Sequence, residues 1–123
     1  MENTILEDIM LATDESFTIG KQMYYMETMK GFTATKLEVR DSINNHIKKQ
    51  IQLEEKVKER IKNDSSLTDA SKDKLITYIS NVCDSNYRAG YYLNNEKEQQ
   101  EYNDWIVDFN IGMKMIKELI LEY

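Results

Sequence analysis

The feature that most constrains this fold is a stripe of mostly apolar residues, at alternating steps of four and three, that ends the chain. It comprises Tyr102, Ile106, Phe109, Met113, Ile116, Ile120 and Tyr123. This spacing keeps all of the side chains on one face of an α-helix. A matching stripe opens the chain and comprises Ile5, Ile9, Ala12, Ser16, Ile19, Met23 and Met26. Both ends of the chain are therefore predicted to be amphipathic helices.

Turn and capping residues divide the chain into four predicted helices, at about residues 4–30, 35–63, 68–93 and 96–122. The boundary signals are Gly31, Thr35 with Glu38, Ser66 or Thr68, and Asn95. Thr35 and Glu38 have the spacing of a capping box, in which each side chain accepts a hydrogen bond from the other residue's backbone N–H. Residues 13–15 mark a further candidate break, which would split the first helix.

The four predicted helices have nearly equal lengths, short connections and no proline to interrupt them. Short connections between helices of equal length force neighbouring helices to run in opposite directions. We therefore expect an all-α fold with one domain over residues 1–123, an antiparallel up-down-up-down four-helix bundle.

Composition and net charge limit the class of binding partner and the cellular compartment that we expect. The net charge of −6 disfavours a nucleic-acid partner, whose phosphates attract basic surfaces. The single cysteine, Cys83, has no internal disulfide partner, which favours a reducing cytoplasm. The first residues are acidic where a signal peptide is basic, and no apolar run is long enough to span a membrane. Abundant Lys, Ile and Asn use AT-rich codons, which indicates a low-GC genome or a mobile element.

The sequence offers little for catalysis or metal binding. A di-iron bundle needs two Glu-x-x-His pairs, but His46 is the only histidine and has no glutamate three residues before it. One cysteine is too few for a thiolate zinc site. The four glycines are isolated and form no phosphate-binding loop. We therefore expect no metal, no cofactor and no enzymatic activity.

One short motif gives an enzymatic alternative. Arg40 and His46 are separated by five residues, and this spacing resembles the motif of HEPN-type ribonucleases, which are helical bundles. In that family the arginine and histidine act together on the scissile phosphate and the 2′-hydroxyl. The resemblance implies that Arg40 and His46 would lie together and cleave RNA.

A second alternative is a small-molecule site. His46, Gln50 and Glu54 follow one another at four-residue steps, on the predicted core face that also carries Ile43 and Ile47. With Asn86 they form either a polar layer that fixes the helix register or one wall of a ligand pocket. Aromatic and arginine residues gather near one predicted end of the bundle. The candidate site for a nucleotide-type ligand comprises Tyr24, Arg40, His46, Gln50, Asn86, Arg88, Tyr91 and Trp105.

The leading functional signal is a second apolar line on the last helix. Val107, Ile111 and Met115 recur every four residues, roughly opposite the core stripe, and Leu119 continues the line. Leu6, Met10 and Phe17 broaden the apolar face of the first helix, which we expect to neighbour the last. A joint external apolar face is typical of an interface. The sequence thus favours a small cytosolic non-enzymatic protein of the immunity, anti-defence or inhibitor type, which binds a protein partner, either a second copy or another protein.

Overall fold

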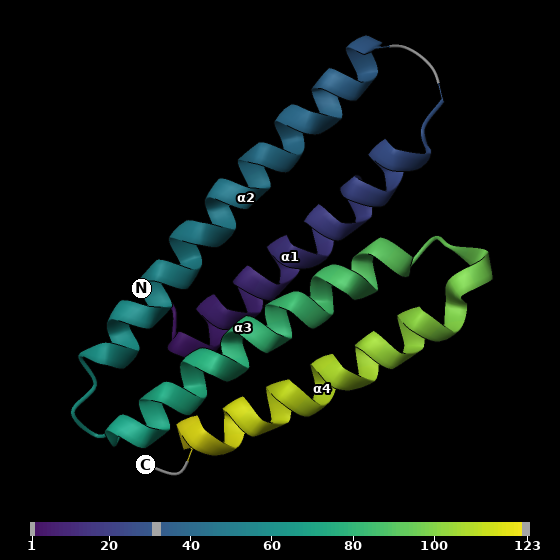
Figure 1. Ribbon diagram of the computed structural model, residues 1–123. Coiled ribbons are helices and arrows are strands. Elements are labelled where there is room, and N and C mark those ends of the chain that lie inside the picture. Colours follow the sequence, from purple (N-terminus) through teal and green to yellow (C-terminus); the bar gives the residue numbers. More distant parts are fainter. Residues whose placement is uncertain (1, 31–32, 122–123) are drawn as a thin grey trace.

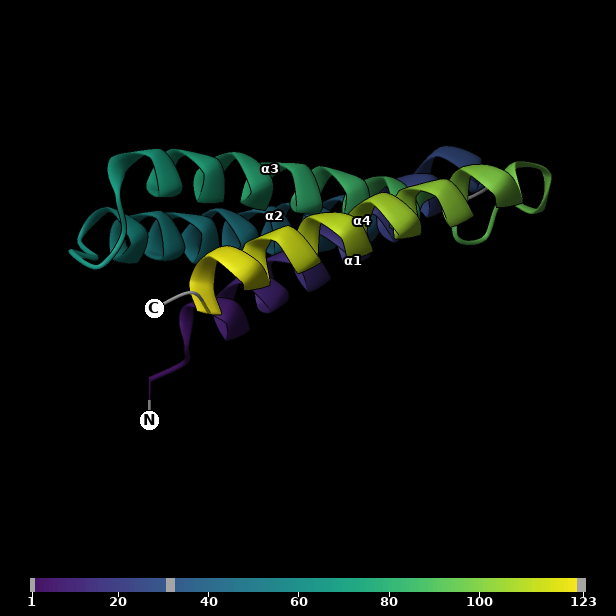
Figure 2. The same cartoon turned by 90° about the horizontal axis from the view of Figure 1, so that it is seen from below.

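The computed structural model describes residues 2–30 and 33–121, and Figure 1 shows the chain. Its helices are α1 (Ile5–Thr28), α2 (Thr33–Lys62), α3 (Asp69–Tyr92) and α4 (Gln99–Leu121), with a short 3-10 helix, η1 (Glu96–Glu98), before α4. The ribbon reverses direction from each helix to the next, so α1 begins and α4 ends at the same end of the bundle (Figures 1 and 2). The predicted all-α four-helix bundle is confirmed, and the described residues contain no strand.

Capping side chains set several helix boundaries. Thr68 caps α3 as predicted, since its hydroxyl accepts a hydrogen bond from the Ser71 N–H at 3.1 Å. Thr4 and Glu7 form a capping box at the start of α1 that the sequence analysis missed. Thr35 was predicted to cap the second helix, but it lies inside α2, which already begins at Thr33. The predicted helix closure at Gly31 lies outside the described residues.

The expected break at residues 13–15 was wrong, because α1 continues through it without interruption. The Thr13 hydroxyl donates to the Met10 carbonyl at 2.8 Å. Its hydrogen-bonding capacity is therefore met within the helix, and the run of polar residues does not break α1.

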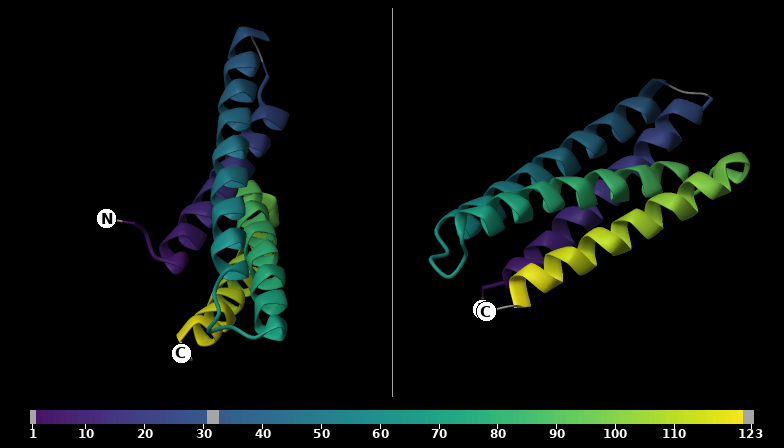
Figure 3. Two further views of the ribbon diagram at one scale, coloured as in Figure 1. Left: turned by 90° about the vertical axis from the view of Figure 1, so that its left-hand side faces the viewer. Right: turned by 60° about the horizontal axis from the view of Figure 1, so that its bottom comes forward.

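The four helices are arranged around a close contact between α1 and α3. Extensive contacts join α1 to α3, α1 to α2 and α3 to α4. The view on the right of Figure 3 shows α2 and α4 on opposite sides of this central pair. We expected the first and last helices to be neighbours, but α1 and α4 make no extensive contact over the described residues. The helices are thus joined in the order α2, α1, α3 and α4, with α1 and α3 in the middle.

Two glycines make this arrangement possible. A Cβ atom on Gly20 would lie 2.0 Å from the Tyr87 carbonyl oxygen, and one on Gly90 would lie 2.2 Å from the Phe17 carbonyl oxygen. Gly20 therefore packs against the backbone of Tyr87, which comes three positions before Gly90. Gly90 packs against the backbone of Phe17, which comes three positions before Gly20. The backbones of α1 and α3 approach so closely that no larger side chain fits between them.

The molecule is built from two similar helical hairpins, α1–α2 and α3–α4. The buried residues of α1 at Ile9, Ala12, Thr13, Ser16, Ile19 and Gly20 recur at the same spacing in α3, at Ile79, Val82, Cys83, Asn86, Ala89 and Gly90. The hairpins thus pack through their first helices, and α2 and α4 flank this central contact.

Candidate functional site

The second apolar line of the last helix lies on the outside of the bundle. The exposed fractions of Val107, Ile111 and Met115 are 54%, 54% and 37%. A helix that served only to fill the core would carry polar residues at these positions. The line is therefore an apolar surface that the fold of this chain leaves open.

The other predicted partner-binding residues do not extend this surface. Leu6 and Leu119 pack against the hydrophobic core. Met10 is exposed, but it lines a shallow depression formed by the N-terminal segment and α1 alone. Phe17 is half-buried beside the close contact of α1 with Gly90. The expected joint face of the first and last helices is not formed, because α1 packs on α2 and α3 and makes no extensive contact with α4.

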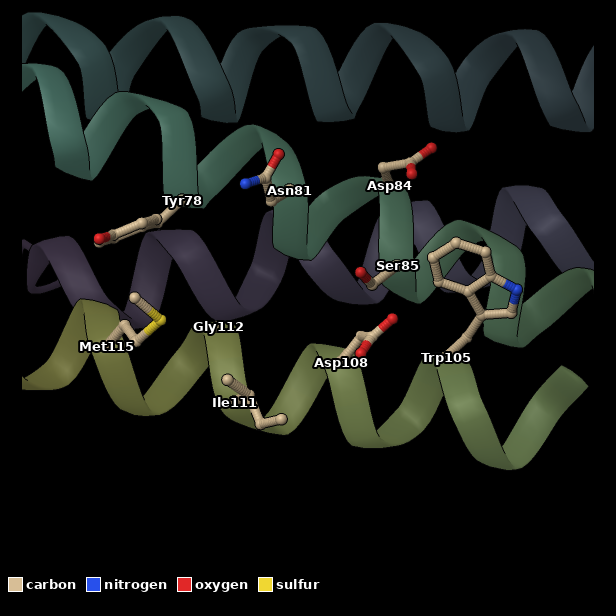
Figure 4. Close-up of a pocket in the computed structure, with 9 residues that line it drawn as sticks. All are labelled: Tyr78, Asn81, Asp84, Ser85, Trp105, Asp108, Ile111, Gly112 and Met115. Carbon is tan, nitrogen blue, oxygen red and sulfur yellow. The ribbon is translucent and has the colours of Figure 1, made fainter.

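A groove between α3 and α4 lies along the exposed line (Figure 4). It has a volume of about 440 Å³ and is lined by Tyr78, Asn81, Asp84, Ser85, Trp105, Asp108, Ile111, Gly112 and Met115. The close-up shows Trp105, Asp108 and Met115 reaching from α4 toward α3. A Cβ atom on Gly112 would lie 2.4 Å from Cγ1 of Val82, so this glycine lets the two helices approach beneath the groove.

Charged groups surround the groove. The Arg88 Nε donates to Asp84 at 3.1 Å, and its guanidinium lies 4.8 Å from the centroid of the Trp105 ring. Asp108 forms no hydrogen bond or ion pair with the rest of the described chain. Asp104, one turn before it, accepts a hydrogen bond from the Gln100 amide at 2.8 Å. The groove therefore joins an apolar strip to carboxylates that are available to a partner.

The aromatic residues predicted at one end of the bundle do gather there. Tyr24 of α1 and Tyr91 of α3 meet edge to face with their ring centroids 5.5 Å apart. The Tyr91 hydroxyl donates to the Glu27 carboxylate, and this hydrogen bond raises the pKa of Tyr91 to about 12. The Tyr24–Tyr91 contact and the Tyr91–Glu27 hydrogen bond thus join α1 to α3.

The candidate ligand-binding residues are held at separate interfaces. His46 Nδ1 of α2 lies 2.5 Å from the Glu15 carboxylate of α1. The Asn86 amide of α3 donates to the Thr13 carbonyl at 2.7 Å, and Gln50 is half-buried on α2. Asn86 and His46 are thus engaged with different sides of α1. Ile47, predicted to be in the core, is exposed, because α2 makes extensive contact only with α1.

The two residues of the ribonuclease-like motif also have separate partners. The Arg40 guanidinium lies 3.8 Å from the exposed carboxylate of Asp41, and His46 pairs with Glu15. In the described part of the chain, no hydrogen bond or ion pair links Arg40 with His46.

Sequence reasoning missed a buried charged cluster around Asp8. This carboxylate is fully buried and lies 3.3 Å from the Arg60 guanidinium and 3.4 Å from the Lys56 ammonium group of α2. Arg60 also donates to the Asn3 carbonyl at 2.7 Å. The available signal was that Asp8, Ala12 and Ser16 follow one another at four-residue steps on the core face of α1. The cluster fastens the start of α1 to α2.

Cys83 is an unsuitable nucleophile. Its side chain is buried between the helices. Burial, and next the negative charge of the nearby Glu54, raise the pKa of the Cys83 thiol to about 12. A thiol reacts as its thiolate, and this one stays protonated at neutral pH.

Three further properties of the chain concern metal binding, membrane spans and similarity to known proteins. Residues 2–30 and 33–121 contain no group of three or more His, Cys, Asp and Glu side chains arranged to hold a metal ion. Within the same ranges, no helix is both long and apolar enough to cross a membrane. No protein-family model, curated protein or solved structure matches this chain.

Proposed function

We propose that this protein acts without catalysis, by binding another protein through the outer face of α4. The observation that carries the proposal is the exposed apolar line of Val107, Ile111 and Met115 beside the α3–α4 groove. Apolar side chains that recur on successive turns and stay in contact with water are typical of interaction surfaces. Trp105, which lines the same groove, belongs to a residue type that is enriched in binding hot spots.

The other hairpin serves as an internal comparison. Asp8 of α1 pairs with Lys56 of α2, and Tyr78, the counterpart of Asp8 in α3, lines the groove with Met115 of α4. Met115 therefore corresponds to Lys56, and Ile111, one turn earlier, corresponds to Gln52; both of these polar residues are exposed. The hairpin architecture therefore accepts polar side chains at these two positions. Because packing does not require Ile111 and Met115, a binding role is the better explanation for their apolar character.

A small acidic protein with such a surface suits the immunity, anti-defence or inhibitor class, whose members act by occupying a surface of their target. The Lys-, Ile- and Asn-rich composition favours an origin in a mobile element. A cytoplasmic location accords with the free thiol of Cys83.

Substitution of Ile111 by glutamate tests the proposal. Immobilised wild-type protein, Ile111→Glu and the matched control Ile51→Glu are incubated with a lysate of the source cells. Ile51 is 48% exposed on α2, so the control makes the same chemical change on a different helix. We expect one partner to be retained by the wild type and by Ile51→Glu and lost from Ile111→Glu, because an uncompensated carboxylate weakens an apolar contact. Equal retention by all three would contradict a role for α4.

Sedimentation of the same three proteins tests the second copy as partner. If the wild type sediments as a dimer and Ile111→Glu as a folded monomer, the α4 face mediates self-association. Unfolding of Ile111→Glu, seen by circular dichroism, would instead place Ile111 in the core and contradict the proposal.

A further inference from the structure

We infer that the α3–α4 groove binds a basic amphipathic helix of a different protein, in which Lys or Arg residues flank a row of large apolar side chains. This inference rests on the proposed function and names the chemistry of the partner. Three observations carry it: the shape of the groove, the charges around it and the poor match of the surface to a second copy.

The groove has the form that receives a helix. It runs between two antiparallel helices, and its lining includes Gly112, which has no side chain, and the small, buried Ser85. Val107, Ile111 and Met115 lie along one side, about 6 Å apart at the rise of an α-helix. Helices that bind in such grooves insert apolar residues at the same one-turn spacing, so apolar rows on both helices can interdigitate.

The charges around the groove are mostly negative. Asp84, Asp104, Asp108 and Glu118 lie on or beside the outer face of α3 and α4, against Lys74, Arg88 and Lys114. Arg88 is already paired with Asp84 and lies against Trp105. The three carboxylates of Asp104, Asp108 and Glu118 therefore exceed by one the two cations that are left to balance them. The chain's net charge of −6 adds a long-range attraction for a basic partner.

The same charges disfavour a second copy. Asp104, Ile111 and Glu118 are seven residues apart, so they lie along one line of α4. A two-fold axis at Ile111 would set Val107 against Met115 of the second copy, but it would also set Asp104 against Glu118 at both ends. A shift of one turn brings Asp104 toward Lys114 and still joins two faces of net negative charge. Like charges across an interface oppose association.

Two synthetic peptides probe this chemistry directly. Both are 18-residue amphipathic helices with leucine on one face; lysine occupies the other face of the first and glutamate that of the second. Neither contains tryptophan, so Trp105, the only tryptophan of the protein, reports occupancy of the groove by its fluorescence. We expect saturable binding of the leucine–lysine peptide, weakened by added salt, and no binding of the leucine–glutamate peptide.

Substitutions in the protein show where the leucine–lysine peptide binds. We expect Ile111→Asn to lower the affinity for the leucine–lysine peptide about tenfold. The double variant Asp104→Lys/Asp108→Lys should lower this affinity at least as much. The matched controls are Ile51→Asn and the double variant Asp41→Lys/Glu55→Lys on α2, where these residues are exposed. The two double variants change the net charge equally, so the controls correct for general attraction and should bind nearly as the wild type does. Circular dichroism verifies the fold of every variant.

Three results would overturn the inference: equal weakening by groove and control variants, binding of both peptides alike, or a wild-type dimer that Ile111→Glu separates. The third would make a second copy the occupant. If the peptides fail while Ile111→Glu still loses a captured partner, the proposed function holds and the basic helix is excluded as its partner. If Ile111→Glu loses nothing from the lysate, the proposed function itself fails.

Discussion

At the scale of single residues, the central helix α1 is held by buried polar groups that are satisfied by its neighbours. Asp8 is bound by Arg60 and Lys56 of α2. The carbonyl of Thr13 accepts a hydrogen bond from the Asn86 amide of α3. Breaking a buried ion pair from one side costs about 3 kcal/mol, because the remaining charge stays buried. These groups therefore fix the position of α1 between α2 and α3.

Cys83 gives a residue-scale prediction about alkaline pH. Its folded-state pKa of about 12 lies above the ordinary value of 9.0 because of burial. Between these two values the unfolded chain loses the thiol proton while the folded protein keeps it, so the free energy of unfolding falls as pH rises. We expect the wild type to lose stability between pH 9 and pH 12 more steeply than Cys83→Ala, as measured by urea unfolding.

The difference between the two proteins isolates the thiol, because Tyr91 and other alkaline groups titrate in both. Reaction with a thiol reagent provides a second measurement. Cys83 should react only at the rate of unfolding at neutral pH, and rapid reaction of the folded protein would show that the thiol is accessible.

Residue patterns predicted the apolar core better than the polar one. Ile9, Ile116 and their stripes are recognisable because large apolar side chains repeat at the helical period. The signal for Asp8 is ambiguous, since it lies on the core face with Ala12 and Ser16 but an aspartate in the first turn of a helix is usually a favourable exposed charge. Its burial depends on Arg60, which is distant in sequence and reaches it only after α2 has packed on α1.

At the scale of helices, the spacing of α1 and α3 depends on Gly20 and Gly90. We expect Gly90→Ala to lower the free energy of unfolding by about 2 kcal/mol, because its Cβ would meet the Phe17 carbonyl, and backbone atoms cannot rotate away. This net loss remains after the gain of about 1 kcal/mol that alanine brings to a helix interior. Urea unfolding measures the change.

Gly112→Ala is the matched comparison. Its new Cβ would meet only the Val82 side chain, which can shift, so the loss should be smaller than for Gly90→Ala. Equal stability of Gly90→Ala and the wild type would mean that α1 and α3 are not held in backbone contact.

The sequence predicted the number and approximate limits of the helices but not their pairing. An apolar stripe indicates which face of a helix is buried, and it does not identify the neighbour that covers this face. Each glycine by itself appeared isolated. Gly20 and Gly90 indicate the α1–α3 contact only when they are considered together, because Gly20 packs on Tyr87 near Gly90 and Gly90 packs on Phe17 near Gly20. The expected α1–α4 face failed for this reason, whereas the exposed line of α4 needed no knowledge of its neighbours.

At the scale of the whole molecule, the two hairpins share a buried pattern and differ on their outer surfaces. The core face of α1 recurs in α3, while Ile111 and Met115 of α4 correspond to Gln52 and Lys56 of α2. The shared pattern builds the bundle, and the differences place apolar side chains on α4 at positions that are polar on α2. The groove is thus separable from the fold, so substitutions there should affect binding more than stability.

This architecture predicts that the chain can be divided between its hairpins. The turn around Ser65 joins α2 to α3, and the main contact between the halves is the α1–α3 interface. Residues 1–64 or 65–123 alone would expose the face of α1 or α3 that is buried in the whole protein, so each should be weakly helical. Mixing them should restore a cooperative helical transition, measured by circular dichroism. Gly90→Ala in the second half should prevent this restoration, because the new Cβ separates the backbones that must meet. Independent cooperative melting of each half, with no gain on mixing, would mean that the hairpins fold without the central contact.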